Sequence, residues 1–217
     1  MPCCSGYCAA QEQFNRKVAN RDLKRYRRRG ADVTTRLLLE ELRSRPLEGL
    51  RILDVGGGIG VIGLELVHAN LASLTMVDAS PAYLEVARNA LGSQFGERPV
   101  EFILGDFAVI ADTIPDADVV TLDRVVCCYP EVETLLGGAV TKARQLLAFT
   151  YPRDRWYVRI VVALENSMRW LKRSKFRVFI HSPERMGALL EAAKFGLVAR
   201  RETLTWVLDI YCRPDAI

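Results

Sequence analysis

Apolar and polar positions change their spacing several times along this chain, and each change predicts a different element. Between residues 13 and 44, apolar side chains recur at helical spacing with a break after Gly30, which predicts helices. From Leu50 onward, short apolar runs predict strands at residues 50–55, 73–78, 100–106, 116–123 and 144–152. The patterns around them predict helices from the glycine cluster through Ala69, and over residues 80–91, 132–143 and 183–194.

Strands that alternate with helices favour a doubly wound α/β fold, in which a mostly parallel sheet carries helices on both faces. Ligands bind such sheets at the carboxyl ends of the strands. Asp54, Asp78 and Asp106 lie at or just after the ends of the first three predicted strands. We therefore expect these carboxylates to face one ligand crevice. Residues 1–12 hold few apolar anchors and are expected to be loose.

The stretch "LDVGGGIGVIGLEL" predicts a tight turn from a strand into a helix. Without side chains, Gly56, Gly58 and Gly60 let the backbone turn sharply and approach a ligand closely. Gly58, Gly60 and Gly63 also match the dinucleotide-binding pattern G-x-G-x-x-G, and Asp78 stands where its ribose-binding acid would stand, so a nicotinamide enzyme is an open alternative. A carboxylate just before the glycines, at position 54, instead favours a ligand with positive charge.

Three motifs in order, "DVGGGIG", "MVDASPAYLEVAR" and "LGDF", resemble those of the class I, Rossmann-like S-adenosylmethionine-dependent methyltransferases. The resemblance covers roughly residues 50–213. It implies that Asp54 and the glycine turn hold the methionine part of S-adenosyl-L-methionine, that Asp78 binds the ribose, and that Asp106 with Phe107 binds the adenine. The cofactor-binding residues expected in this way are Asp54, Gly56, Gly58, Gly60, Asp78, Ala79, Ser80, Asp106, Phe107 and Asp123.

The same resemblance implies a seven-stranded, mostly parallel sheet with an antiparallel last strand, because "FGLVARRETLTWVLDIYCR" is similar to the last strands of that family. It divides the chain into an N-terminal helical cap, residues 1–46, and a Rossmann-like methyltransferase domain, residues 47–217. A helical insertion at about residues 153–181 follows the fifth strand.

The stretch "LDRVVCCYPE" after the fourth strand would border the pocket of the methyl acceptor. It is similar to the "LDVLIHYP" segment of the magnesium-protoporphyrin O-methyltransferases, but Cys128 stands where that family has a histidine thought to take part in its chemistry. We expect Tyr129, Cys128 and Asp123 to form the catalytic side, with Tyr129 orienting the acceptor or packing as a core aromatic. Asp123 and Arg124 either bind the acceptor or pair with each other.

Cys127 and Cys128 admit two interpretations. On a strand, neighbouring side chains point to opposite faces, so at most one thiol would face the pocket. The pair is either two small buried hydrophobic residues, or it joins Cys3, Cys4 and Cys8 around a soft metal or metalloid ion. The spacing is not that of a zinc site, and we expect free thiols and no bound metal.

The insertion carries apolar residues at helical spacing, which predicts an amphipathic helix. Such a helix would cover the pocket as a lid, pack into the core, or lie on a membrane surface beside the basic residues Arg169, Lys172 and Arg173. The apolar stripe consists of Trp156, Ile160, Ala163, Leu164, Ser167 and Leu171.

Composition and charge bear on the cellular location and the binding partners that we expect for the protein. The chain has 217 residues and a net charge of +4, with a basic run over residues 16–29 that is either a solvated helix face or a nucleic-acid footprint. It lacks a secretory signal pattern at its start and an apolar run of bilayer length, so we expect a cytoplasmic protein. The expected partner is a small-molecule acceptor, and no oligomeric state is predicted.

The expected activity is methyl transfer from S-adenosyl-L-methionine to an oxygen, nitrogen or sulfur atom of a small molecule. A nucleic-acid acceptor is disfavoured, because the segment after the fourth strand matches neither the adenine-amino nor the cytosine-C5 methylation motif. The alternatives are a magnesium-protoporphyrin-type carboxyl O-methyltransferase, a metalloid or thiol methyltransferase, an RNA methyltransferase, and a non-catalytic protein that binds the cofactor.

Overall fold

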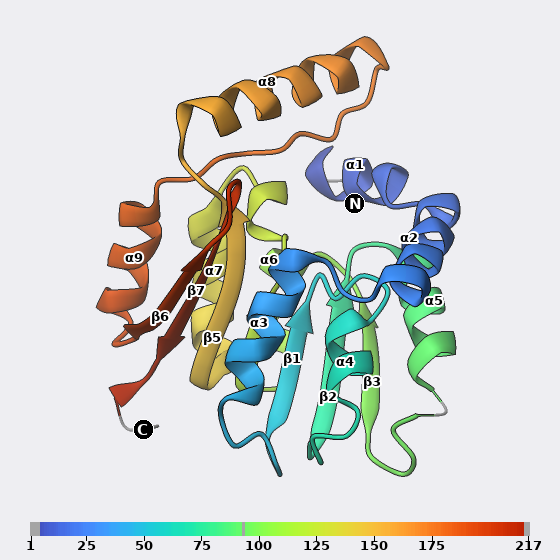
Figure 1. The fold of residues 1–217 in the computed structure, drawn as a ribbon, viewed down its shortest axis with the longest axis vertical. Helices are drawn as coiled ribbons and strands as arrows, with labels where there is room; N and C mark the ends of the chain where they lie inside the picture. The colour runs from blue at the N-terminus through green and yellow to red at the C-terminus, as the bar shows by residue number, and fades with distance from the viewer. Residues whose placement is uncertain (1–4, 93, 215–217) are drawn as a thin grey trace.

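The computed structural model describes residues 5–92 and 94–214, and it shows a seven-stranded sheet with helices on both faces (Figure 1). The strand order is β3-β2-β1-β4-β5-β7-β6, with β7 antiparallel to both of its neighbours and the other pairs parallel. The predicted fold class is therefore confirmed. The strands are β1 (Arg51–Val55), β2 (Ser73–Asp78), β3 (Val100–Leu104), β4 (Ala117–Leu122), β5 (Ala143–Pro152), β6 (Gly196–Glu202) and β7 (Trp206–Cys212).

The helices follow the predicted positions with two corrections. Residues 1–12 were expected to be loose, but α1 begins at Ser5, and the segment is anchored by contacts of Gln11 and Phe14 with the body that no local pattern reveals. The helix after the glycine turn ends at Leu66 rather than Ala69. The α-helices are α1 (Ser5–Gln13), α2 (Arg16–Arg29), α3 (Val33–Arg43), α4 (Val61–Leu66), α5 (Pro81–Leu91), α6 (Phe107–Ile110), α7 (Val132–Lys142), α8 (Trp156–Leu171) and α9 (Pro183–Ala192).

The sheet separates two apolar cores. Helices α3, α4 and α5 pack on one face through residues such as Leu38, Leu66 and Leu91, and α6, α7 and α9 pack on the other through Phe107, Leu136 and Leu190. Every residue of β4 is buried, as expected for a central parallel strand that is covered on both faces.

A buried charge network holds the antiparallel strands together. Asp209 in β7 is 2% exposed and accepts hydrogen bonds from Tyr151 in β5 and from Arg200 in β6, the latter bidentate at 2.6 and 2.8 Å. The carboxylate is thus satisfied from both neighbouring strands, which ties the edge strand β6 to the sheet.

The insertion after β5 forms α8 and an extended strap, residues 172–182, which runs back beneath the helix to α9 (Figure 1). Both lie beyond the carboxyl ends of the strands, as do α1 and α2. Among the described residues, no helix is long and apolar enough to cross a membrane. The division of the chain at residue 46 stays a prediction.

Candidate functional site

The glycine turn after β1 brings backbone close to two neighbouring segments. Gly56 has a φ of +63°, and a side chain there would collide with Val125. A Cβ atom on Gly57 would lie 2.7 Å from Oδ2 of Asp54 and 2.7 Å from Cε of Met76. Glycine is therefore required at both positions, because the backbone of the turn packs directly against Asp54 and Val125.

Asp54 is the most deeply buried acid at the turn. It lies opposite Thr121 in the β1–β4 register, and the Thr121 hydroxyl donates to its Oδ1 at 2.8 Å. Its Oδ2 is buried and has no hydrogen-bond partner among the described residues. Burial, with smaller contributions from the charges of Asp123 and Asp78, raises the pKa of Asp54 to about 7. This oxygen is an unused acceptor in a site that favours a positive neighbour.

Asp78 fixes the glycine turn at the end of β2. Its Oδ2 accepts from the Gly58 N–H at 3.0 Å and its Oδ1 from the Ser80 N–H at 2.7 Å. Burial raises the pKa of Asp78 to about 6, against the opposing effect of these two N–H donors. Both carboxylate oxygens already accept hydrogen bonds from backbone N–H groups, so a ligand that bound them would share them with the backbone.

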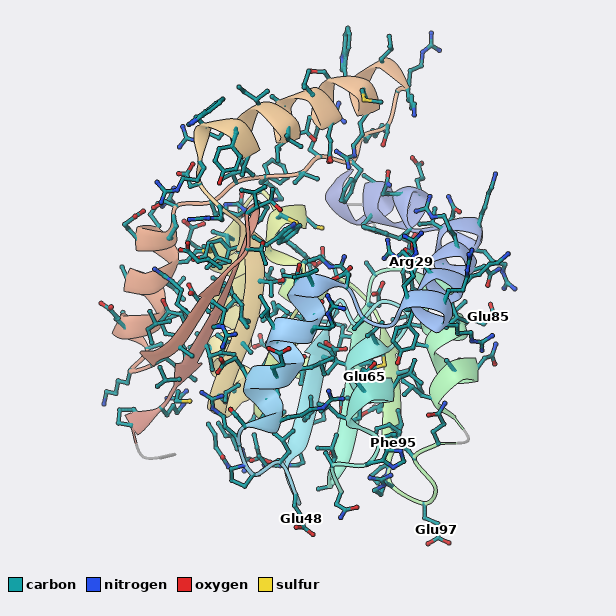
Figure 2. All side chains as sticks on the ribbon, viewed as in Figure 1. Arg29, Glu48, Glu65, Glu85, Phe95 and Glu97 are labelled. Carbon is teal, nitrogen blue, oxygen red and sulfur yellow. The ribbon has the colours of Figure 1, made fainter. Side chains whose placement is uncertain are left out.

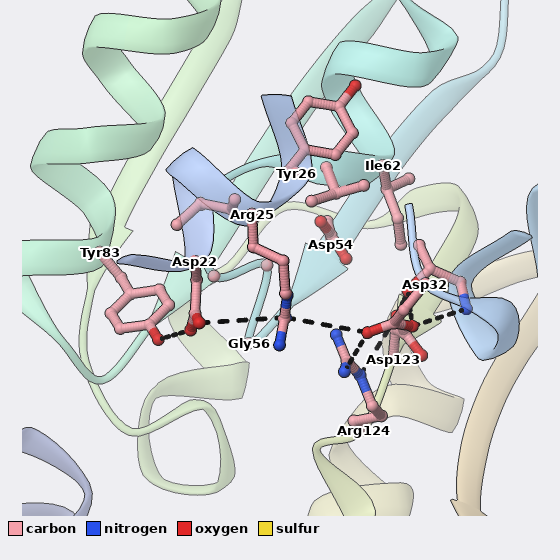
Figure 3. Close-up of a pocket in the computed structure, with 15 residues that line it drawn as sticks. Asp22, Arg25, Tyr26, Asp32, Asp54, Gly56, Ile62, Tyr83, Asp123 and Arg124 are labelled. Carbon is pink, nitrogen blue, oxygen red and sulfur yellow. Dashed lines mark hydrogen bonds and ion pairs between the residues drawn. The ribbon is translucent and has the colours of Figure 1, made fainter. Parts of the chain in front are cut away.

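A cavity of about 90 Å³ lies over the turn (Figure 3). Its lining combines the glycine turn and Asp54 with side chains from α2, α3 and the loop after β4. Four of the lining residues are carboxylates and two are arginines, so the cavity carries an excess of negative charge. The charged lining residues are Asp22, Arg25, Asp32, Asp54, Asp123 and Arg124.

A chain of polar contacts crosses this cavity from the cap to the sheet (Figure 3). The Tyr83 hydroxyl donates to Asp22 at 2.5 Å, and Arg25 lies 3.9 Å from both Asp22 and Asp32. Asp32 then pairs with Arg124 at 2.5 Å. The cap is therefore connected to the sheet by ion pairs rather than by apolar packing alone.

Asp123 lies directly after β4 and joins three elements. Its carboxylate accepts hydrogen bonds from Thr35 of α3 at 2.5 Å and from Thr150 of β5 at 2.7 Å. Arg124, at a φ of +59°, lies 3.8 Å from it. The suggested pairing of Asp123 with Arg124 is thus present, and both residues also line the cavity.

The sequence did not single out the lining residues from α2 and α3. Asp22 and Arg25 belong to the basic run of residues 16–29, which by itself predicts a solvated helix face or a nucleic-acid footprint. The only signal was the single acid within that run, Asp22, and the acid at the start of the next helix, where Asp32 is the N-cap of α3. Tyr26 and Thr35 gave no signal. Helical spacing cannot show which distant segment a helix will cover.

Asp106 and Phe107 lie outside the cavity lining. Asp106 caps α6 and accepts a hydrogen bond from the Tyr129 hydroxyl at 2.5 Å. Burial and this carboxylate raise the pKa of Tyr129 above its ordinary value, so the phenol stays protonated. Phe107 is 2% exposed and packs in the core beside α7, so the expected stacking surface is not available there. Of the three strand-end acids expected to face one crevice, Asp54 lines this cavity, and the roles of Asp78 and Asp106 toward a ligand stay predictions.

The cap covers Ala79 and Ser80, two residues expected to bind the cofactor. The Gln11 side-chain amide donates to the Ala79 carbonyl at 3.1 Å, and the Ser80 hydroxyl donates to the Phe14 carbonyl at 2.5 Å. Ser80 is also the N-cap of α5 and is buried. A ligand that reached these groups would have to displace the cap.

Cys127 and Cys128 lie in a 3₁₀ turn, Val126–Cys128, and not on a strand, so the expected alternation of their side chains is wrong. Both thiols lie 3.6 Å from the Arg124 carbonyl oxygen and 4.0 Å from each other. The hydrogen bond with Cys127 and burial raise the pKa of the Cys128 thiol. No metal-binding group of acids, histidines and cysteines occurs among the described residues, and Cys3, Cys4 and the Cys8 side chain lie outside them.

Comparisons with known proteins match this arrangement to one class. The Methyltransferase small domain family matches residues 24–123. The ubiquinone biosynthesis O-methyltransferase of Azorhizobium caulinodans is 32% identical over 171 residues, which cover 76% of this chain and 66% of that protein. The ribosomal RNA large subunit methyltransferase G of Stutzerimonas stutzeri is 36% identical over 104 residues, 48% of this chain and 26% of that protein. The chain thus spans from about a quarter to about two thirds of these relatives.

Solved structures share the fold at low identity. Magnesium protoporphyrin IX methyltransferase from Synechocystis PCC 6803, crystallised with bound SAH, has a TM-score of 0.71 at 15% identity and covers 94% of this chain and 97% of that one. The N-methyltransferase NodS from Bradyrhizobium japonicum WM9 has a TM-score of 0.66 at 16% identity, with 94% and 98% covered. The fold is that of the Rossmann-like methyltransferases. The matched family, the curated relatives and these solved structures are all methyltransferases.

Proposed function

We propose that this protein transfers the methyl group of S-adenosyl-L-methionine to an oxygen, nitrogen or sulfur atom of a small molecule. The observation that carries this proposal is the buried, unpartnered Oδ2 of Asp54 in a cavity lined by four carboxylates and two arginines. A sulfonium with a zwitterionic amino-acid tail matches that charge pattern, because it brings two positive groups and one negative group.

The residues over the glycine turn fit the methionine end of this cofactor. Asp54 and Asp123 would hold its positive groups, and Arg25 or Arg124 would hold its carboxylate. The cavity of about 90 Å³ is far below the roughly 300–1,000 Å³ of ordinary ligand pockets, so the adenosine would enter only after a shift of the cap. The cap contacts at Ala79 and Ser80 would open in that shift.

The side chains expected beside the methyl acceptor, Tyr129, Cys128 and Asp123, are better suited to positioning the acceptor than to strong acid–base catalysis. A methyl group that already carries positive character needs mainly an acceptor held in line with it. Tyr129 and Cys128 stay protonated because their pKa values are raised. Each would donate a hydrogen bond to an acceptor only after leaving its present partner, Asp106 for Tyr129 and the Arg124 carbonyl for Cys128. Asp123 would be the carboxylate on this side, and it would take a proton only if its bonds to Thr35 and Thr150 opened.

Calorimetry with three ligands tests the choice of cofactor. The wild-type protein should bind S-adenosylmethionine and S-adenosylhomocysteine, and not NADH. Asp54→Asn keeps the shape of the side chain and its hydrogen bond with Thr121 but removes the charge. The affinity for S-adenosylmethionine, a sulfonium, should therefore fall by about tenfold more than the affinity for S-adenosylhomocysteine, a neutral thioether. Tight binding of NADH without either adenosyl compound would exclude the proposal. Turnover on a panel that includes porphyrin carboxylates, quinol precursors and arsenite would separate an enzyme from a non-catalytic binder.

RNA is a second candidate acceptor, favoured by one feature of the cap. Helix α2 places exposed Arg27, Arg28 and Arg29 in its last turn, one turn beyond the cavity-lining Arg25. Methylation of RNA that is lost in Arg28→Glu/Arg29→Glu, with small-molecule turnover absent, would select this acceptor. Retained small-molecule turnover in that variant would select the first proposal.

A further inference from the structure

The apolar stripe of α8 faces away from the protein. Trp156, Leu164, Trp170 and Leu171 are 74%, 61%, 71% and 78% exposed, and Ile160 and Met168 on the same side are about half exposed. In Figure 2 many side chains of this helix project away from the molecule. The interpretation of the stripe as core packing is therefore wrong, and the role of the helix as a lid stays a prediction. An outward apolar surface this dense on one helix marks an interaction site.

The opposite side of α8 explains why the stripe faces outward. Val158 is 3% exposed, and the Asn166 side chain makes two hydrogen bonds with the backbone of Val178 in the strap, at 2.8 and 2.9 Å. Arg169 lies over the ring of Phe176, 5.7 Å from its centroid. These contacts fix the rotation of the helix, so the exposed stripe is a consequence of the packing below it.

Positive charge surrounds the stripe. The two acids of the region are occupied, since Asp154 pairs with Arg159 and Glu165 pairs with Arg169. The basic side chains at the two ends of the helix are exposed and have no ion-pair partner among the described residues. They are Arg155, Lys172, Arg173 and Lys175.

We propose that α8 is a docking surface for an anionic lipid bilayer, with its apolar stripe in the interface and its basic ends on the headgroups. An apolar face bounded by lysine and arginine, with tryptophan near each end, is typical of helices that lie in the membrane plane. Because α8 lies beyond the carboxyl ends of the strands, docking would turn the edge of the sheet that carries the cavity toward the lipid (Figure 1).

A second copy of the chain is a poorer occupant of this surface. If two α8 helices paired antiparallel, Arg155 of one copy would meet Lys172 and Arg173 of the other at both ends. A parallel pair would bring identical cations together. Like charges oppose both arrangements, whereas phosphate headgroups neutralise the same side chains.

Binding to vesicles tests this inference independently of any methyl transfer. The full chain would be mixed with vesicles of phosphatidylcholine alone, or of equal parts phosphatidylcholine and phosphatidylglycerol, and followed by flotation. Two of its three tryptophans lie in α8, so a blue shift of tryptophan fluorescence would report insertion. We expect binding and a blue shift with the anionic vesicles, and weaker binding at high salt.

Matched variants assign the binding to α8. Leu164→Ser/Leu171→Ser should weaken vesicle binding by about tenfold or more, whereas Leu197→Ser/Val198→Ser on the exposed edge strand β6 should not. Lys172→Gln/Arg173→Gln should weaken vesicle binding by about fivefold for each neutralised side chain, and Arg28→Gln/Arg29→Gln on α2 should weaken it much less. Circular dichroism would check that each variant folds. Absence of vesicle binding, or a lipid-free dimer abolished by the leucine variant, would overturn the inference.

Discussion

Replacing Asp54 by asparagine should remove part of the loss of stability that the ligand-free protein shows as the pH rises. The carboxylate is 1% exposed, has one donor in Thr121, and has a pKa raised to about 7 by burial. Between its ordinary pKa and about 7 the folded protein therefore holds a proton that the unfolded chain has released. The free energy of unfolding must then fall as the pH rises through this range.

The size of the effect follows from the two pKa values. With 3.8 for the unfolded chain and about 7 for the folded protein, Asp54 lowers the free energy of unfolding by about 2–3 kcal/mol between about pH 5 and about pH 8. Asparagine has the same shape and cannot ionise. The difference between Asp54→Asn and the wild-type protein should therefore grow in favour of the variant by that amount as the pH rises. The similar contribution of Asp78, whose pKa is raised to about 6, is common to both proteins and cancels.

Urea unfolding at a series of pH values measures this difference. Asp118→Asn is the matched control, because the hydrogen bonds from Arg51 lower the pKa of Asp118. That acid is ionised in both states throughout the range, so the offset of the control from the wild-type protein should stay constant. Parallel curves for Asp54→Asn and the wild-type protein would show that Asp54 is ionised in the closed cavity with its charge already compensated there. The argument that this carboxylate needs a cationic ligand would then fail.

Other variants test the turn, the last strands and the acceptor side. Gly57→Ala should abolish binding of S-adenosylhomocysteine in calorimetry, since its Cβ would crowd Asp54, whereas Gly137→Ala in α7, with nothing within 4 Å, should raise the free energy of unfolding by about 0.5–1 kcal/mol. Arg200→Ala should lower that free energy by about 2–3 kcal/mol in urea titrations, because it leaves the buried carboxylate of β7 without its bidentate partner. Tyr129→Phe removes one hydrogen bond, so it should lower the free energy of unfolding by about 1 kcal/mol in the same titrations. It should also lower turnover without changing the affinity for the cofactor.

The elements set by local pattern could be predicted from the sequence. The apolar run of β4 is buried on both faces, and Ser80 with Pro81 starts α5 as expected from capping chemistry. The position of Asp54 beneath the glycine turn also followed from the sequence, because strand ends in a parallel sheet share one edge. Each of these inferences uses residues that are close in sequence or equivalent in a repeated unit.

The features that depend on long-range packing could not be predicted. The bond between Asp32 and Arg124 joins residues 92 positions apart, and no periodicity specifies it. Phe107 follows Asp106 as the expected motif requires, yet the first turn of α6 directs it into the core. The helical spacing in α8 revealed an apolar stripe but not its direction, because the strap beneath the helix, through Val178 and Phe176, decides which face is covered.

The closed cavity connects the cap to the chemistry proposed for the site. Arg25 and Arg124 form ion pairs with Asp22, Asp32 and Asp123 in the closed cavity, and the same groups would receive the charged tail of the cofactor. Binding would therefore exchange one set of ion pairs for another, with little net gain in charge pairing. The gain would come mainly from Asp54, whose Oδ2 has no hydrogen-bond partner to lose and would release only a proton. A site built in this way favours a ligand whose positive group reaches that oxygen over one that offers only the zwitterionic tail, and the sulfonium is the group that separates the methyl donor from ordinary amino acids.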